Sequence, residues 1–235
     1  MTSSTSTKEP QNLRRAAFRE QQRRKQQRTR TYTIMGVTII ALVIAAILII
    51  PNLPVSAENV AVPTPLIHPQ ANGTFMGDPN APVKVIEYSD FKCIHCRNFW
   101  EDQEKQLIEE YIAPGKVYFE YVPLSFVRAD SLNATLGAYC ALEQDAFWTY
   151  HDYLFANYDA EATEPMLIAI AEKAGLDSAA FKKCFNSGTY RQQATDNAAK
   201  ASALGVTGTP TFLVNGNLAN RAELFTLIDQ ALSGN

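Results

Sequence analysis

Residues 89–100, SDFKCIHCRNFW, contain the pattern that decides the fold of this chain. Cys93 and Cys96 are separated by two residues, an apolar run precedes them, and a stretch with helical spacing follows them. A cysteine pair with this spacing can hold a metal ion, form a structural disulfide or exchange electrons with another dithiol. The local structure and the compartment of the motif distinguish these three uses.

The motif lies where a predicted strand meets a predicted helix. Residues 83–89 and 116–124 are rich in β-branched and aromatic side chains, which predicts two strands. Between them, apolar side chains recur at three- and four-residue steps through residues 99–111, which predicts a helix that ends at Pro114 and Gly115. A β-α-β unit requires two parallel strands and a right-handed crossover. The sequence therefore predicts an α/β fold with the cysteine pair at the start of a helix.

This position favours redox chemistry. Unpaired backbone N–H groups and the positive end of the helix dipole favour a thiolate, which lowers the pKa of the Cys93 thiol. We therefore expect Cys93 to be the nucleophile and Cys96, one turn further along the helix, to resolve the mixed disulfide. His95 adds a hydrogen-bond donor near the Cys93 sulfur, and a positive charge when it is protonated. A stabilised thiolate favours the reduced form, which makes the disulfide a stronger oxidant.

Metal binding and a purely structural disulfide are the alternatives. Zinc needs four close ligands, and the remaining cysteines, Cys140 and Cys184, do not form a second CxxC motif. His95 is adjacent to Cys96 and is poorly placed to complete a tetrahedron with both cysteines. A structural disulfide usually closes a longer loop, because a longer loop constrains the unfolded chain more. We therefore predict a redox-active pair and no metal site.

Residues 31–50, TYTIMGVTIIALVIAAILII, form an apolar stretch without a formal charge. At about 1.5 Å per residue, a helix of this length crosses a bilayer core of roughly 30 Å. Residues 1–30 hold nine Lys/Arg and two Asp/Glu, so the positive-inside rule predicts that they are cytoplasmic. The sequence thus predicts a single-pass cell-membrane protein with an extracytoplasmic catalytic domain. The alternative is a cleavable signal peptide that ends at Ala57.

The rest of the chain is acidic and divides into a linker and one domain. After residue 30 it holds twelve Lys/Arg and twenty-two Asp/Glu, which argues against a nucleic-acid partner. Residues 51–74 contain several prolines and no regular apolar pattern, so we predict an extended linker in which His68 is exposed. Residues 75–235 suffice for one globular domain, in which residues 128–204 have helical spacing. His151 lies among aromatic positions there and is expected in the core or at its rim.

Two motifs together carry a resemblance to a known family. MGDPNAPVKVIEYSDFKCIHC (residues 76–96) and GVTGTPTFLVNG (residues 205–216) resemble the DsbA-like branch of the thioredoxin superfamily, particularly the membrane-anchored thiol-disulfide oxidoreductases of bacteria. The resemblance covers roughly residues 75–235 and implies a thioredoxin fold with an all-helical insertion. It also implies that Thr209 and Pro210 form a cis-proline loop that faces the cysteines, and X-Pro bonds are where cis peptides occur. One departure is Ile94, because many oxidant members have proline before the histidine.

Glu87 matches a further position of the family, where an acidic residue is buried beneath the disulfide. Strand alternation gives Glu87 the same face as Val83, Val85 and Ser89. A carboxyl group buried there would have a raised pKa and could accept the proton of Cys96. The alternative is a glutamate that faces solvent.

Cys140 and Cys184 lie on separate predicted helices of the insertion. Free thiols in an oxidising compartment are exposed to mispairing, so we predict that these two cysteines form a structural disulfide. The alternative is a pair of buried reduced thiols that pack as small apolar groups.

These patterns predict an extracytoplasmic thiol-disulfide oxidoreductase, an oxidase that introduces disulfides into exported proteins through Cys93 and Cys96. The resemblance alone implies its partners: exported proteins with free cysteines, and a quinone-linked membrane protein, DsbB-like or VKOR-like, that reoxidises it. No cofactor is expected. The alternative function is a reductase or a client-specific assembly factor for a cysteine-containing metalloprotein.

Overall fold

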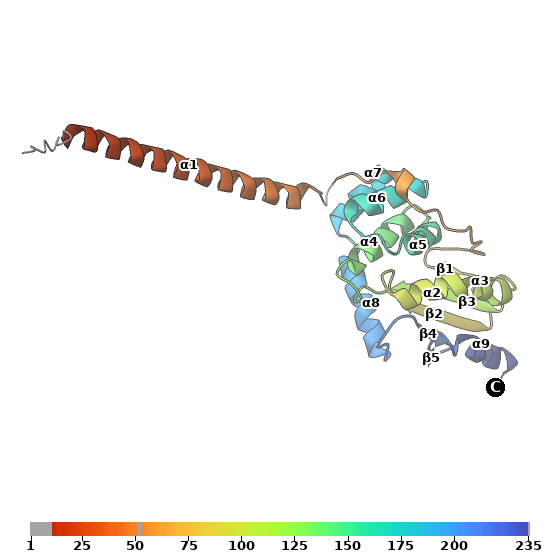
Figure 1. Ribbon diagram of the computed structural model, residues 1–235. Coiled ribbons are helices and arrows are strands. Elements are labelled where there is room, and N and C mark those ends of the chain that lie inside the picture. Colours follow the sequence, from red (N-terminus) through yellow and green to blue (C-terminus); the bar gives the residue numbers. More distant parts are fainter. Residues whose placement is uncertain (1–10, 51–52, 235) are drawn as a thin grey trace, which may run out of the picture. The chain divides into compact units, whose positions relative to one another are not determined.

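The computed structural model describes residues 11–50 and 53–234 (Figure 1). The chain divides into two units, Met1–Leu53 and Pro54–Asn235, which we describe separately. Part of the predicted cytoplasmic N-terminus (residues 1–10), the start of the predicted linker (residues 51–52) and Asn235 lie outside the described residues.

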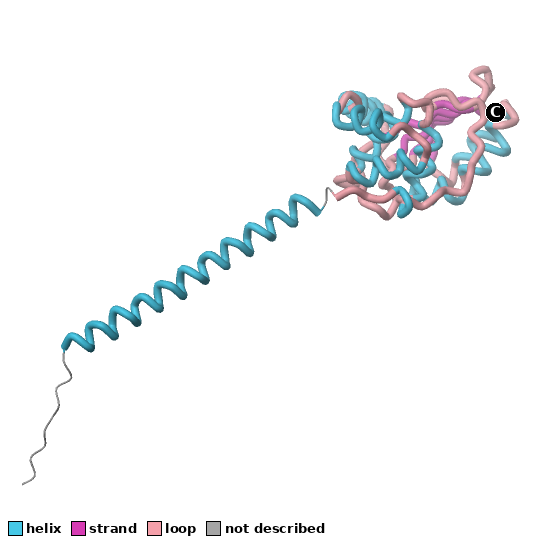
Figure 2. The backbone as a smooth tube through the Cα atoms, turned by 90° about the horizontal axis from the view of Figure 1, so that it is seen from above, coloured by secondary structure: helices cyan, strands magenta, loops and turns pink. Residues whose placement is uncertain are grey.

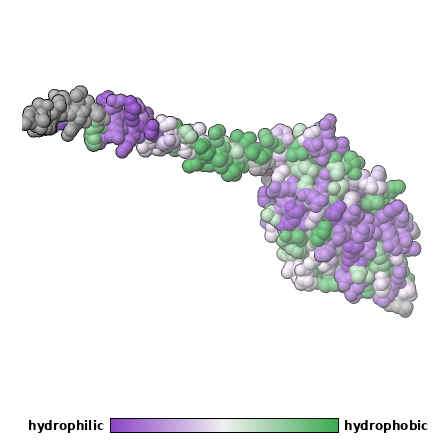
Figure 3. Space-filling view, viewed as in Figure 1, coloured by the Kyte–Doolittle hydropathy of each residue, from purple (hydrophilic) through white to green (hydrophobic). Residues whose placement is uncertain are grey.

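The first unit contains one long helix, α1 (Gln11–Ile49). Figure 3 shows hydrophilic side chains on the N-terminal part of α1 and hydrophobic side chains on its C-terminal part. The segment Phe18–Ile49 is long and apolar enough to cross a membrane. It contains the predicted span up to residue 49, and α1 is therefore a candidate membrane anchor.

The second unit is built on a mixed sheet with the strand order β1-β3-β2-β4-β5. The central strand β2 pairs parallel to β3 and antiparallel to β4, and this register places Glu87 between Tyr121 and Phe212. The predicted parallel pair is therefore confirmed, and the cysteine motif follows the carboxyl end of the central strand. The strands are β1 (Phe75–Met76), β2 (Val83–Ser89), β3 (Val117–Pro123), β4 (Thr211–Val214) and β5 (Asn217–Ala219).

The helix expected over residues 99–111 is interrupted in the structure. It consists of α2 (Ile94–Asp102), α3 (Glu104–Leu107) and a wider π-helical turn, η3 (Ile108–Ile112). The backbone leaves helical geometry at Gln103, where φ is −130°. The final helix is α9 (Leu224–Ser233).

Five helices form the insertion between β3 and β4: α4 (Ser131–Leu142), α5 (Phe147–Ala156), α6 (Glu164–Lys173), α7 (Ser178–Ser187) and α8 (Arg191–Ala203). Their span agrees with the predicted residues 128–204. A residue in the left-handed region, Asp145 with φ 54°, lies between α4 and α5. Figure 2 shows the strands gathered in one part of the second unit, with most of the helices beside them.

The two faces of the sheet pack against different helices. On one face Phe99 of α2 packs against Phe212, and their ring centroids are 4.8 Å apart. On the other face Tyr88 and Leu124 pack in a smaller cluster with Ala201 of α8. The two faces of β2 differ, since Val83 and Val85 are buried and Lys84 is exposed, so a shift of one residue, which would exchange the faces, is unfavourable.

The segment 54–74, which includes a short 3₁₀ turn, η2 (Ala57–Asn59), belongs to the second unit, packs against the rest of it and is not a free tether. Val60 is buried, and Ala61 exchanges two hydrogen bonds with the Asn157 side chain, at 2.8 and 2.9 Å. The expectation that His68 is exposed is wrong, because its side chain is 9% exposed and its ring stacks on Trp148. Val60 and Val55 of this segment pack with the core, whereas Val62 and Ile67 are exposed.

Candidate active site

Cys93 is the N-cap residue of α2, so its sulfur lies beside the first backbone N–H groups of that helix. Its backbone N–H donates to the Asp90 carbonyl at 2.9 Å, which closes the turn after β2. Its Sγ lies 3.2 Å from the carbonyl oxygen of Thr209, which the Thr209–Pro210 cis peptide presents to the motif. Both cysteines are reduced and buried, with Cys93 5% and Cys96 1% exposed.

The two thiols differ strongly in acidity. A hydrogen bond from Cys96 is the main reason why the pKa of the Cys93 thiol falls from 9.0 to about 5, against the opposing effect of burial. The Thr209 side chain and the backbone N–H groups of Cys96 and His95 lower it further. Burial raises the pKa of Cys96 well above its ordinary value, and its contacts with Cys93 and Glu87 add to this rise. The site thus pairs a stabilised thiolate with a thiol that retains its proton.

Glu87 lies in the protein interior beneath the cysteines, 3% exposed. Burial raises the pKa of Glu87 to about 8, which the nearby Ser89 hydroxyl opposes and a negative charge on Cys93 reinforces. Tyr121, the cross-strand neighbour of Glu87, is also fully buried, and its pKa is raised by burial and by the charge on Glu87. The carboxyl group can therefore hold a proton near neutral pH.

His95 is placed differently from the sequence-based expectation. Its side chain is exposed on α2, and the group that reaches the Cys93 sulfur is its backbone N–H. The structure therefore brings together Cys93, Cys96, Glu87, Thr209 and Pro210, while the imidazole of His95 faces solvent.

Two charged residues beside the motif were not identified from the sequence. Both carboxylate oxygens of Asp90 accept backbone N–H bonds, one from Lys92 and the other from Phe126 and Val127. The Lys92 side chain is 4% exposed and donates to the carbonyls of Tyr158 and Ala160, which precede α6. These contacts join the active-site turn to the insertion. No sequence pattern identified them, since these partners in and before the insertion lie 36 to 68 residues away.

The other two cysteines are remote from the motif along the chain. Cys140 of α4 and Cys184 of α7 form a disulfide, with their Cα atoms 5.7 Å apart. His151 of α5 is 1% exposed among aromatic rings, and its Nδ1 lies 3.0 Å from a carboxylate oxygen of Asp152. It is therefore a core histidine.

Comparisons with known proteins agree with this geometry. Residues 70–232 match the family model described as Thioredoxin. The chain is 35% identical over 153 residues to the probable disulfide bond formation protein D of Bacillus cereus, and the match covers 62% of this chain and 71% of that protein. Oxidised BdbD of Bacillus subtilis aligns with a TM-score of 0.64 at 26% identity, over 75% of this chain and 100% of BdbD.

The DsbA of Chlamydia trachomatis shares the fold. It aligns with a TM-score of 0.60 at 22% identity, over 71% of this chain and 96% of that one. The family match spans the sheet, the CxxC turn, the insertion and the cis-proline loop. The chain therefore belongs to the thioredoxin family, and within it to the DsbA-like thiol-disulfide oxidoreductases.

Proposed function

We propose that this protein is a membrane-tethered oxidase that transfers the Cys93–Cys96 disulfide to proteins exported across the membrane. The observation that carries the proposal is the difference between the two thiols. A Cys93 pKa of about 5 makes this sulfur a stable thiolate at neutral pH, which favours the reduced enzyme. An enzyme whose reduced form is stabilised gives up its disulfide readily.

The reaction follows from these acidities. A substrate thiolate attacks Cys93 Sγ, a new intermolecular S–S bond forms, and the Cys93–Cys96 bond breaks. The leaving sulfur, Cys96, takes up a proton because its pKa is high. Glu87, with a pKa of about 8, is the adjacent group that can supply this proton.

A second substrate thiolate then attacks the substrate sulfur of the mixed disulfide. Cys93 leaves as a thiolate, and a thiol of low pKa is a good leaving group. Overall the substrate loses two electrons and two protons and gains a disulfide, while the enzyme gains both electrons. The oxidised enzyme is restored when a membrane partner accepts these electrons; a quinone-linked protein of the DsbB-like or VKOR-like type fits this need.

The test is equilibration of the full chain, in detergent micelles, against glutathione redox buffers. We expect a reduction potential nearer to the strong-oxidant value of about −120 mV than to the thioredoxin value of about −270 mV. The His95→Ala variant keeps the backbone N–H that reaches the Cys93 sulfur and removes only an exposed imidazole, so it should leave the potential nearly unchanged. A wild-type potential below about −230 mV would contradict an oxidase and favour a reductase or a client-specific assembly factor.

A further inference from the structure

Three side chains that can bind a metal converge away from the cysteine motif. His68 comes from the segment that precedes β1, Glu104 is the first residue of α3, and Asp152 lies on α5. One ligand atom of each lies within 4.8 Å of the others, and His68 Nε2 is 3.6 Å from Asp152 Oδ2. Three segments far apart in the sequence thus supply one nitrogen and two carboxylate groups to the same point.

The three side chains are largely buried, and two of their polar atoms lack a hydrogen-bond partner within the described residues. The side chains of His68 and Asp152 are 9% and 6% exposed, and Glu104 is 2% exposed. Within the part of the chain that the structure describes, His68 Nε2 and Glu104 Oε1 have no hydrogen-bond partner. A buried polar atom without a partner is destabilising and requires an explanation. Here two such atoms belong to the same three-residue cluster.

Neighbouring residues hold the ligands in a fixed orientation. Asp152 Oδ1 accepts a hydrogen bond from Trp100 Nε1 at 3.1 Å and lies 3.0 Å from His151 Nδ1, which leaves Oδ2 directed at His68. The imidazole of His68 stacks on Trp148, with ring centroids 5.2 Å apart. Outer contacts of this kind orient the ligands of protein metal sites.

The composition of the cluster also suits a cation. Two carboxylate groups and one imidazole are largely buried at one point, and buried charges in proteins are paired with an opposite charge or bound to a metal ion.

We propose that His68, Glu104 and Asp152 form a binding site for one zinc ion. An imidazole nitrogen with two carboxylate oxygens suits zinc, whereas calcium and magnesium prefer oxygen ligands alone. Tetrahedral bonds of about 2.1 Å place ligand atoms roughly 3.4 Å apart, so small side-chain shifts would close the site. The ion would fasten the segment 54–74 to α3 and α5.

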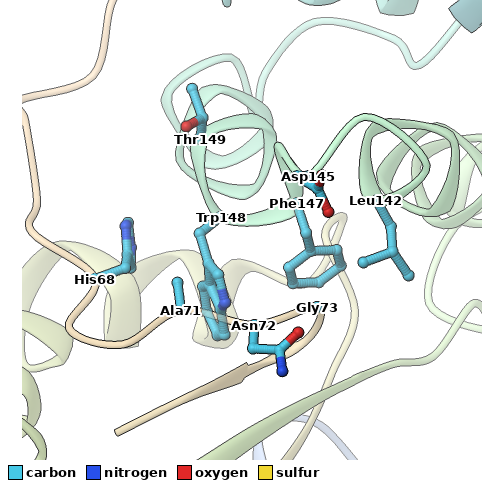
Figure 4. Close-up of a pocket in the computed structure, with 9 residues that line it drawn as sticks. All are labelled: His68, Ala71, Asn72, Gly73, Leu142, Asp145, Phe147, Trp148 and Thr149. Carbon is cyan, nitrogen blue, oxygen red and sulfur yellow. The ribbon is translucent and has the colours of Figure 1, made fainter.

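A cavity adjoins His68, one of the three proposed ligands. It has a volume of about 350 Å³ and is lined by His68, Asn72, Asp145 and Trp148, among others. Figure 4 shows His68 and Trp148 among the residues that surround it. Zinc needs a fourth ligand beside three protein ligands, and a water molecule can supply it.

The test uses the full chain in detergent with the Cys93–Cys96 disulfide intact, so that these thiols cannot bind zinc. After chelator treatment, ZnCl₂ is added, and bound metal and the midpoint of thermal unfolding are measured. We expect one zinc per chain and a raised midpoint, with no rise on addition of CaCl₂ or MgCl₂. X-ray absorption at the zinc edge should show nitrogen and oxygen ligands without sulfur; sulfur ligands, or no bound zinc, would overturn the site.

Variants identify the ligands. His68→Phe keeps the ring stacked on Trp148 but removes Nε2, and Glu104→Gln keeps the size of the side chain but removes its charge. Each should weaken zinc binding by roughly 100-fold or more, whereas Glu109→Gln, an exposed change on the adjacent turn, should not alter it. Circular dichroism of the metal-free variants checks that they are folded. Equal zinc affinity in folded wild-type and variant proteins would overturn the proposal and leave Glu104 as a protonated buried acid.

Discussion

At the residue scale, the acidity of Cys93 depends on contacts that reach its sulfur. The chain after residue 30 carries an excess of about ten negative charges, which oppose a thiolate. Most of them act across solvent, where salt screens charges over about 8 to 10 Å, whereas the hydrogen bonds at Cys93 act at contact range. The low pKa is therefore a property of the turn and the cis-proline loop, and single substitutions there should change it.

The first prediction ranks two of these contacts. Cys96→Ala removes the main cause of the low Cys93 pKa, and Thr209→Val removes a weaker one while it keeps the shape of the side chain. We expect both variants to raise the pKa of Cys93 above about 5, and Cys96→Ala to raise it more. The pH dependence of iodoacetamide alkylation of Cys93 measures this. A larger shift in Thr209→Val would contradict the assignment.

The second prediction concerns Glu87 in the reduced protein. Its pKa is 4.5 when exposed and about 8 in the fold, so folding takes up a proton between these values. Its contribution to stability is complete below about pH 4.5 and is lost as the pH rises through about 8. The Glu87→Gln side chain does not titrate. The unfolding free energy of this variant minus that of wild type should therefore increase from pH 5 to pH 9.

The expected gain at pH 9 is a few kcal/mol, since one pKa unit corresponds to about 1.4 kcal/mol. Urea unfolding under reducing conditions at several pH values measures it, and the titration of Cys93 is common to both proteins. Glu101→Gln, an exposed change on α2, is the control and should show no such trend. A difference between wild type and Glu87→Gln that is constant with pH would contradict a buried protonated Glu87.

At the element scale, Lys92 holds the active-site turn against the insertion. Its Nζ donates to the carbonyls of Tyr158 and Ala160 and lies 3.6 Å from a carboxylate oxygen of Asp130. Lys92→Met leaves these acceptors buried with fewer partners, so we expect a loss of about 3 kcal/mol in unfolding free energy. Lys84→Met, at an exposed position of β2, should change it by less than about 0.5 kcal/mol. Similar losses in both variants would exclude a bridging role for Lys92.

The disulfide between α4 and α7 closes a loop with a sequence separation of 44 residues. The chain-entropy model gives about 4 kcal/mol for a loop of this length. We therefore expect the double variant Cys140→Ala/Cys184→Ala to lose stability of this order, measured by urea unfolding with the Cys93–Cys96 pair kept in one redox state. Peptide mapping of the non-reduced wild type should yield the two cysteines in one linked fragment; separately alkylated peptides would exclude the bridge.

Local patterns explain which elements could be predicted. The strands β2 and β3 alternate clearly and flank a helix with a regular apolar spacing, so the β-α-β unit follows from the sequence. The helix α8 has only two buried residues, Ala194 and Ala201, and no strong apolar face indicates it. The break at Gln103 lacks proline or glycine, and its side chain accepts a hydrogen bond from Arg221, 118 residues away. Contacts between residues so far apart in the sequence cannot be predicted from a local pattern.

The same limit applies to the site. The motifs that contain Cys93, Cys96 and Pro210 can be recognised directly in the sequence. The alternation of side chains along β2 predicts that Glu87 points into the protein. Tyr121 could have been found from the parallel pairing, because it is the cross-strand neighbour of Glu87. The burial of His68 could not, since it depends on a stacked partner 80 residues later.

At the scale of the whole molecule, the last prediction concerns retention of the anchor. Cleavage after Ala57 would cut the turn η2, where the Ser56 hydroxyl accepts the backbone N–H of Glu58, and would remove Val55, which packs against the core. Since the residues on both sides of this bond contribute to the folded unit, we expect α1 to remain attached. Mass spectrometry of the membrane fraction should detect the uncleaved chain. A soluble protein that begins near Glu58 would contradict retention. A reporter fused after Asn235 should be active only if it matures outside the cytoplasm, because the positive-inside rule predicts that the basic residues before α1's apolar part are cytoplasmic.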